Sequence, residues 1–163
     1  MSTEKNLSDA FAGESQANRK YLAFAKQADT EGFSQVAKLF RATAEAETIH
    51  AHSHLKTLGM IKSTAENLKA AIAGETYEFE KMYPGFITEA KNENNTDALR
   101  SFTLANEAEK VHADLYSKAL ANLDAKAPVD YYLCTICGHI HENGAPDACP
   151  ICGAKAKAYK KID

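Results

Sequence analysis

The chain has 163 residues, of which 45% are apolar and 25% are charged, and its formal net charge is −3. This length holds one domain of ordinary size and a small second one, and the apolar content excludes a disordered chain. The acidic balance gives no basic surface for a polyanion, which excludes nucleic acid as a principal partner. Apolar stretches are only a few residues long, so we expect no membrane partner and a cytoplasmic protein.

Residues 7–123 have helical composition, rich in Ala, Leu, Glu and Lys, with apolar residues spaced by three and four. This pattern predicts four amphipathic helices. Gly32 and Gly59 are placed to end the first two helices, and Ser-Thr-Ala-Glu at residues 63–66 forms a capping-box pattern that opens the third. Polar residues at 94–97 separate the third helix from the fourth.

The third predicted helix contains an interruption, because Pro84 and Gly85 follow each other inside it. A proline within a helix removes one backbone hydrogen bond, and its ring clashes with the carbonyl group four residues earlier. We therefore expect a kink or a local unwinding of the third helix at this point.

The helical part contains an internal repeat. Ala-Gly-Glu-Ser at residues 12–15 returns as Ala-Gly-Glu-Thr at 73–76, an offset of 61, and segment 45–51 returns at 107–113 with an offset of 62. The second pair of segments is identical at five of seven positions, which favours a tandem duplication over a coincidence of Ala-rich and Glu-rich sequence. We expect an all-α four-helix bundle made from two copies of a helical hairpin, with a site shared between the repeats.

A small second domain follows the helical part. We place the helical domain at residues 1–125, a linker at 126–130 and the small domain at 131–163, a segment too short to fold without a metal. Its two Cys-x-x-Cys-Gly motifs can offer four thiolates to one ion, either structural zinc or redox iron. The four predicted ligands are Cys134, Cys137, Cys149 and Cys152.

A second set of metal-ligating side chains lies on the predicted helices. Glutamate and histidine at i and i+3 share one helix face, and each repeat carries one such pair and one further glutamate. Carboxylate-bridged di-iron and di-manganese bundles use this set of residues. The alternative is a row of solvated charges on the helix surface. The predicted ligands are Glu14, Glu47, His50, Glu75, Glu78, Glu109 and His112.

Glu78 is the seventh member of a set that needs six, because its counterpart in the first repeat is Ala17. Five bound glutamates carry five negative charges, which suits the six positive charges of two ferric ions better than the four of two ferrous ions. We therefore expect Glu78 to bind one iron in the oxidised state and neutral His50 to replace it on reduction. The alternative is that Glu78 lies beside the ligands without binding.

Several motifs together carry a family resemblance, and they agree in order and spacing over nearly the whole chain. They are residues 11–17, residues 74–78 with 82–84, both Glu-x-x-His pairs and the two cysteine motifs. These motifs resemble the rubrerythrin family. The short connection near Gly59 differs from the long crossover of some members of that family, which leaves the chain topology open.

The resemblance implies a ferritin-like di-iron bundle followed by a rubredoxin-like Fe(Cys)4 domain. It also implies a peroxidase that reduces hydrogen peroxide to water, with electrons that come from NAD(P)H through a separate reductase or rubredoxin and pass from the Fe(Cys)4 centre to the di-iron site. The same seven ligands are implied, with one iron moving between Glu78 and His50. The alternatives are a ferritin-like protein that oxidises and stores iron, and a zinc-ribbon interaction module.

Other polar residues carry weaker evidence of a functional role. Tyr21 and Tyr83 follow Glu14 and Glu78 and can direct hydroxyl groups at the ligating carboxylates, although a role in the core is an alternative. The remaining histidines and the basic C-terminal residues are expected to be solvated, namely His52, His54, His139, His141, Lys155, Lys157, Lys160 and Lys161.

The length of the second connection predicts an intertwined homodimer. In a ferritin-like bundle the link between the second and third helices must travel the length of a helix, ~37 Å for about 25 residues. Residues 59–64 span only ~20 Å when fully extended. We therefore expect each di-iron site to combine the first hairpin of one subunit with the second hairpin of its partner.

Overall fold

A computed structural model describes residues 2–125 and 127–163, so Lys126, at the start of the predicted linker, lies outside the described residues. The chain forms two compact units, Met1–Lys62 and Ser63–Asp163. The helical elements are α1 (Thr3–Thr30), α2 (Ser34–Thr57), α3 (Thr64–Tyr77), the π-helix η1 (Glu78–Met82), α4 (Tyr83–Asn92) and α5 (Thr96–Ala121). The C-terminal elements are β1 (Tyr131–Cys134), β2 (Ile140–Glu142), the 3-10 helix η2 (Ala156–Ala158) and β3 (Tyr159–Ile162).

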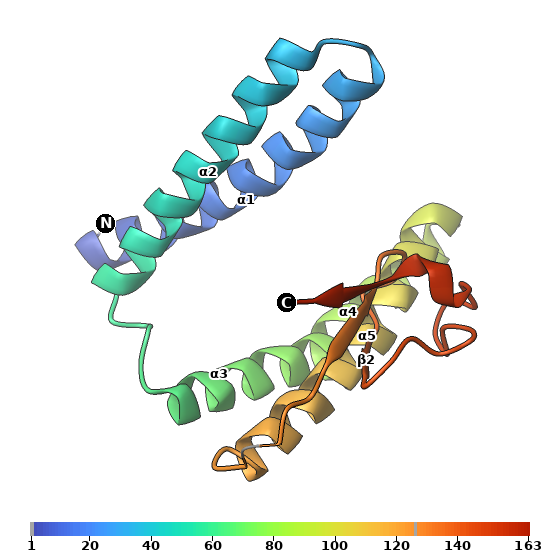
Figure 1. Cartoon of the computed structure of the whole chain (residues 1–163). Helices are drawn as coiled ribbons and strands as arrows, with labels where there is room; N and C mark the ends of the chain where they lie inside the picture. Colours follow the sequence, from blue (N-terminus) through green and yellow to red (C-terminus); the bar gives the residue numbers. More distant parts are fainter. Residues whose placement is uncertain (1, 126) are drawn as a thin grey trace. The chain divides into compact units, whose positions relative to one another are not determined.

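The first unit is a hairpin of α1 and α2, which lie side by side (Figure 1). Small side chains let the two backbones approach closely, since the buried residues at their contact are Ala25, Ala28, Ala37, Ala44 and Ala51. Asn18 is also buried, and its amide group crosses to α2, where it donates hydrogen bonds to the Ala44 carbonyl and the Thr48 hydroxyl. A buried amide is tolerated here because it is hydrogen-bonded.

The second unit contains the other hairpin, in which α5 contacts α3, η1 and α4. Ser63 and Glu66 form the predicted capping box at the start of α3, and the Asn95 side chain caps α5 by accepting a hydrogen bond from the Ala98 amide. Gly32 and Gly59 end the helices of the first unit with positive φ angles of 84° and 66°. The expected fold class is confirmed: the described residues form four helical rods and a small three-stranded sheet.

The third helical rod consists of α3, η1 and α4, and it departs from α-helical geometry one turn earlier than we expected. The sequence placed the disturbance at Pro84 and Gly85, whereas the structure places it at η1, where the Tyr83 amide donates to the carbonyl of Glu78, five residues before it. Pro84 then stands in the first turn of α4, where its missing N–H breaks no helical bond. A π-helical turn accommodates one extra residue. It accounts for the step in repeat offset from 61 to 62.

The C-terminal sheet has the strand order β2-β1-β3, with both pairs antiparallel. Tyr131 is opposite Glu142 in one pair and opposite Ile162 in the other. The sheet contacts α5 through β2, and Lys118 on α5 pairs with Glu142. None of the helices within residues 2–125 and 127–163 has the length and hydropathy needed to cross a membrane.

Candidate metal centres

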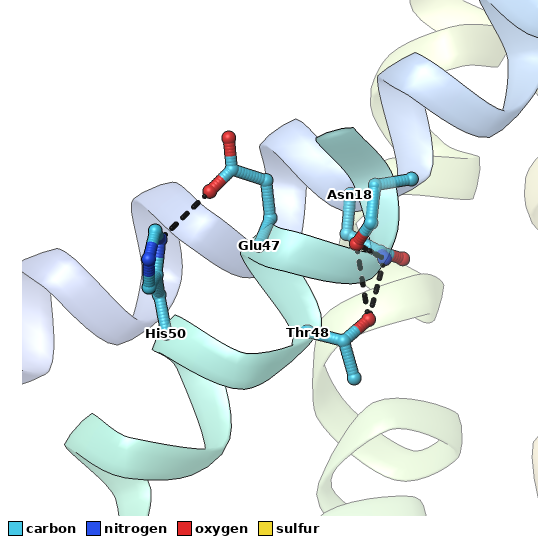
Figure 2. A network of polar contacts seen from close by, with 5 residues as sticks. Asn18, Glu47, Thr48 and His50 are labelled. Atoms are coloured by element: carbon cyan, nitrogen blue, oxygen red, sulfur yellow. Dashed lines mark hydrogen bonds and ion pairs between the residues drawn. The ribbon is translucent and has the colours of Figure 1, made fainter. Parts of the chain in front are cut away.

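The first hairpin carries the first group of predicted ligands. Glu14 on α1 and the Glu-x-x-His pair Glu47 and His50 on α2 place ligand atoms within 4.8 Å of one another. Figure 2 shows the contact between His50 Nδ1 and a Glu47 carboxylate oxygen, which are 3.0 Å apart. The Glu47 side chain is 14% exposed and that of His50 is 56% exposed. His50 is therefore the more solvent-exposed member of the pair in this chain.

The second hairpin carries the corresponding group. Glu75 on α3 and the pair Glu109 and His112 on α5 also place ligand atoms within 4.8 Å of one another. His112 Nδ1 lies 2.7 Å from a Glu109 oxygen and 3.6 Å from a Glu75 oxygen. Each hairpin thus brings together one glutamate from its first helix and a Glu-x-x-His pair from its second. These are the side chains that the repeat predicted.

The carboxylates of the second hairpin are crowded in a way that a cation would relieve. Glu75 Oε2 is buried and has no hydrogen-bond partner among the described residues. Burial and the neighbouring Glu109 carboxylate raise the pKa of Glu75 above its ordinary value. Each effect penalises the charged form, which a bound metal ion stabilises instead. This donor set therefore fits a metal, and carboxylate and imidazole ligands suit iron.

Glu78 lies at the first position of η1, so the π-helical turn is what presents this seventh predicted ligand. Its carboxylate is half-buried, and burial together with the charge of Glu75 raises its pKa. Glu78 is not among the three residues of the second hairpin whose ligand atoms cluster within 4.8 Å. The charge of Glu75 therefore acts on Glu78, but Glu78 lies outside the cluster formed by Glu75, Glu109 and His112.

The two tyrosines singled out in the sequence occupy equivalent places. Tyr21 contacts Phe24 and Phe40, with ring centroids 6.3 and 6.1 Å away. Tyr83 makes the same contacts one repeat later, with Phe86 and Phe102 at 6.2 and 6.3 Å. Burial and the charges of three carboxylates raise the pKa of the Tyr83 hydroxyl, and those carboxylates belong to Glu109, Glu78 and Glu75. Tyr83 therefore packs among aromatic rings, and the charges of these carboxylates act on its hydroxyl.

A hydrogen bond that we did not predict joins the second hairpin to the small domain. His112 Nε2 lies 2.9 Å from the carbonyl oxygen of Gly138, the residue after Cys137. Because a carbonyl only accepts, Nε2 carries the hydrogen, and Nδ1 presents its lone pair toward Glu75 and Glu109. Such a bond fixes the orientation of a ligating histidine. Nothing in the local pattern around residue 138 predicts this contact.

The four cysteines form the third group. Their sulfur atoms lie within 4.8 Å of one another, with Cys134 and Cys152 at 3.7 Å and Cys137 and Cys149 at 3.5 Å. All four are free thiols, which excludes a disulfide pairing in this structure. Burial opposes ionisation of Cys149, but hydrogen bonds from the Cys152 amide and the Tyr159 hydroxyl lower its pKa to about 6. The cluster is shaped for a tetrahedral thiolate site and fits Fe(Cys)4.

The expected solvation of the remaining histidines holds for some and is wrong for His139. His52 and His141 are exposed, and His54 is half-buried. His139 is only 5% exposed, and its Nδ1 lies 2.7 Å from the Tyr159 hydroxyl. The backbone of His139 is also held, because its carbonyl accepts a hydrogen bond from the Cys134 amide at 2.8 Å. Among the basic residues, Lys161 pairs with Asp130, and Lys155, Lys157 and Lys160 are exposed.

Comparison with known proteins gives the same division of the chain. The rubrerythrin family model matches residues 5–120, and the model of the rubredoxin-like domain of rubrerythrin matches residues 132–160. Nigerythrin of Nitratidesulfovibrio vulgaris is 41% identical over 93% of this chain and 82% of its own length. Rubrerythrin of the same organism is 36% identical over 98% of this chain and 93% of its own.

Solved structures agree with the sequence comparison. Nigerythrin in a partially reduced state aligns with a TM-score of 0.62 and 38% identity, over 99% of this chain and 87% of the nigerythrin chain. The fully reduced, all-ferrous state gives the same values. Both family models, the relatives and the two kinds of metal-ligating group point the same way. The chain belongs to the rubrerythrin family.

Proposed function

We propose that the protein is a peroxidase that reduces hydrogen peroxide to two molecules of water with two electrons and two protons. The observation that supports it most is the hydrogen bond from His112 to Gly138, because it connects a predicted di-iron ligand to the cysteine site. An iron pair held by the glutamates and histidines would supply the two electrons that cleave the O–O bond, and an iron held by the four cysteines would accept replacement electrons one at a time and pass them to the pair. The proposed electron source is NAD(P)H, through a separate reductase or rubredoxin.

The tyrosines are proposed to hold protons beside the reacting centre. Burial and nearby carboxylates raise the pKa of Tyr83, so its hydroxyl stays protonated at neutral pH. A protonated hydroxyl can donate to a ligating carboxylate or to a peroxide oxygen that becomes water. Tyr21 occupies the equivalent position in the first repeat and takes the same proposed role.

Glu78 and His50 are proposed to exchange as ligands of one iron. The charge of Glu75 and burial disfavour the Glu78 carboxylate in the absence of extra positive charge. Ferric iron provides more of that charge than ferrous iron, so Glu78 is assigned to the oxidised state. His50 is neutral as a ligand, which suits the lower charge of ferrous iron, and it is assigned to the reduced state.

We also propose that the protein is an intertwined homodimer. Helix α2 has 24 residues and is about 36 Å long. The six residues between α2 and α3 span only about 20 Å. Large apolar side chains remain exposed on both hairpins, among them Phe24, Leu39, Ile49 and Phe86. Each site would take Glu14, Glu47 and His50 from one subunit and Glu75, Glu78, Glu109 and His112 from its partner.

The domain limits and the cellular location complete the proposal. The helical domain is assigned to residues 1–125, the linker to 126–130 and the Fe(Cys)4 domain to 131–163; β1 begins at Tyr131. A cytoplasmic location is proposed because the four cysteines are arranged as free thiols around one metal position.

The test uses the full chain and a variant that ends at Ala127. Reduced under anaerobic conditions, both should consume one hydrogen peroxide per iron pair, but only the full chain should turn over with the physiological donor. The truncated protein should also bind its iron pair roughly 10-fold more weakly, because His112 loses the carbonyl that orients it. Turnover of the truncated protein at the full rate would refute the electron path.

Iron storage is the second candidate function. The oxidant that is consumed and the number of irons bound per chain distinguish it from the peroxidase. A storage protein would consume dioxygen and accumulate many ferric ions per chain, whereas the proposed peroxidase retains two irons in the bundle and one in the cysteine site. The cysteine cluster favours the peroxidase, since a one-electron centre serves repeated reduction and has no use in storage. Element analysis and visible absorption also show whether the cysteine site holds iron or zinc, because a ferric thiolate site is coloured and a zinc thiolate site is colourless.

A further inference from the structure

Two polar contacts join the small domain to α5, one at each end of β2. His112 Nε2 donates to the carbonyl oxygen of Gly138, shortly before β2, at 2.9 Å. Lys118 Nζ pairs with the carboxylate of Glu142, the last residue of β2. His112 and Lys118 are six residues apart, which is about 9 Å along the helix axis. The small domain is therefore attached to α5 at two separate points.

The space between α5 and the sheet is incompletely filled. A cavity of about 290 Å³ has apolar walls from both parts, among them Leu115 on α5 and Ile140 on β2. A second cavity, of about 470 Å³, is lined by Lys118 and Glu142 together with Val129 of the linker. Side chains that face such a space lose dispersion contacts on that side. The two polar contacts therefore carry much of the attachment.

The ion pair is the weaker and more salt-sensitive of these two contacts. The Lys118 side chain is 60% exposed and that of Glu142 is 21% exposed. Water competes for exposed charges and dissolved salt screens them, so such a pair changes an equilibrium constant by no more than about fivefold. The side chain of His112 is only 18% exposed, and its bond to a neutral carbonyl is less affected by salt.

We propose that Lys118 and Glu142 are positioning residues, whose ion pair acts as a latch that holds the small domain on α5 and keeps the Gly138 carbonyl on His112. When the pair opens, one of the two attachment points is lost and the domain detaches more readily. The consequence for electron transfer rests on the proposed function, since the docked domain contacts a predicted di-iron ligand. The latch itself requires neither iron nor peroxide.

The second lysine of α5 provides a matched control. Lys110 is exposed on the same helix as Lys118, but it forms no ion pair among the residues that the structure describes. A charge reversal at residue 110 therefore changes the net charge of the helix as much as one at residue 118 does, without touching the contact to the small domain. Any effect of total charge alone appears in both variants.

The measured quantity is the rate at which the His112 Nε2–H hydrogen exchanges with solvent, followed by NMR. The full-length protein is loaded with zinc, which is diamagnetic and keeps the cysteine site folded. Exchange requires release of the Gly138 carbonyl, so its rate is proportional to the detached fraction even when that fraction is small. Lys118→Met should speed exchange about two- to fivefold. Lys118→Glu should speed it further, because it repels Glu142, and Lys110→Glu should leave the wild-type rate.

Two further measurements distinguish a latch from general damage to the fold. The double variant Lys118→Glu with Glu142→Lys rebuilds the ion pair in reverse, so its exchange rate should return toward the wild-type rate. Raising sodium chloride from about 0.05 M to about 0.5 M should speed exchange more in wild type than in Lys118→Met, which has no pair for the salt to screen.

The proposal is overturned if Lys118→Met and Lys118→Glu exchange at the same rate as wild type and Lys110→Glu, or if the double variant exchanges as fast as Lys118→Glu. If Lys118→Glu is unfolded by far-UV circular dichroism, the salt response of Lys118→Met decides: a response equal to that of wild type overturns the latch, and a smaller one supports it. Because neither iron nor peroxide takes part, a failed latch leaves the peroxidase standing. A protein that has the latch and consumes no peroxide would overturn the peroxidase alone.

Discussion

The amide of Asn18 allows a sharp test of how the first hairpin is held together. Its Nδ2 donates to the Ala44 carbonyl at 2.7 Å and to the Thr48 hydroxyl at 2.8 Å (Figure 2). Asn18→Ala removes both bonds, at about 1 kcal/mol each. The Ala44 carbonyl keeps the Thr48 hydroxyl as a donor, so no buried acceptor is left without a partner. Alanine is the better helix former by about 0.6 kcal/mol, which leaves a net loss of about 1.4 kcal/mol.

The assay is urea unfolding of the metal-free protein followed by far-UV circular dichroism, since bound metal would add its own stabilisation. Asn6→Ala on the exposed face of α1 is the matched control, and it should be neutral or slightly stabilising. Thr48→Val removes one acceptor of the same amide. The double variant Asn18→Ala with Thr48→Val should therefore lose about 1 kcal/mol less than the sum of the single variants. A loss below about 0.5 kcal/mol for Asn18→Ala, or strict additivity, would refute the reasoning.

Three further predictions concern the metal centres. Cys134→Ser should abolish the visible colour of the ferric thiolate site while the far-UV circular dichroism of the helices stays unchanged; a melted bundle would contradict the separation of the two domains. Glu78→Ala should leave reduction by the donor intact and slow reoxidation by peroxide in anaerobic single-turnover measurements, and an unchanged rate would remove Glu78 from the proposed exchange. Because burial raises the pKa of Glu75 above its ordinary 4.5, its contribution to metal-free stability is present below that value and is lost as the pH rises through the raised pKa. The part of the urea midpoint in chelator that depends on Glu75 should therefore fall as the pH rises above 4.5, and the difference between wild type and Glu75→Gln should shrink over that rise.

The helices and their ends were accessible from the sequence because the signals for them are local. Apolar spacing, the capping box at Ser63 and the glycines after α1 and α2 act within a few residues. The duplication predicted that each hairpin contributes one glutamate and one Glu-x-x-His pair to a shared site, and in the structure the ligand atoms of each hairpin cluster within 4.8 Å. The step in offset from 61 to 62 was also visible, but the sequence alone did not show that a π-helical turn absorbs it.

Contacts between elements far apart in the chain were not accessible. His112 and Gly138 are 26 residues apart, and their bond depends on how the small domain packs against α5. The burial of His139 likewise goes with a contact to a distant residue, the 2.7 Å hydrogen bond between its Nδ1 and the Tyr159 hydroxyl, and not with the residues next to it. A histidine in a glycine-rich loop resembles a solvated residue until the sheet is formed.

The division into two units has a consequence for synthesis on the ribosome. Every internal contact of the first unit lies within Met1–Lys62, so this hairpin can form while the remaining 101 residues are still to be made. At roughly 5 to 20 residues per second, that takes about 5 to 20 seconds, whereas helical hairpins with local contacts form in milliseconds or faster. The nascent chain therefore displays Phe24, Leu39 and Ile49 for seconds before the second hairpin emerges. Neighbouring chains on one polysome have time to meet through these surfaces before release.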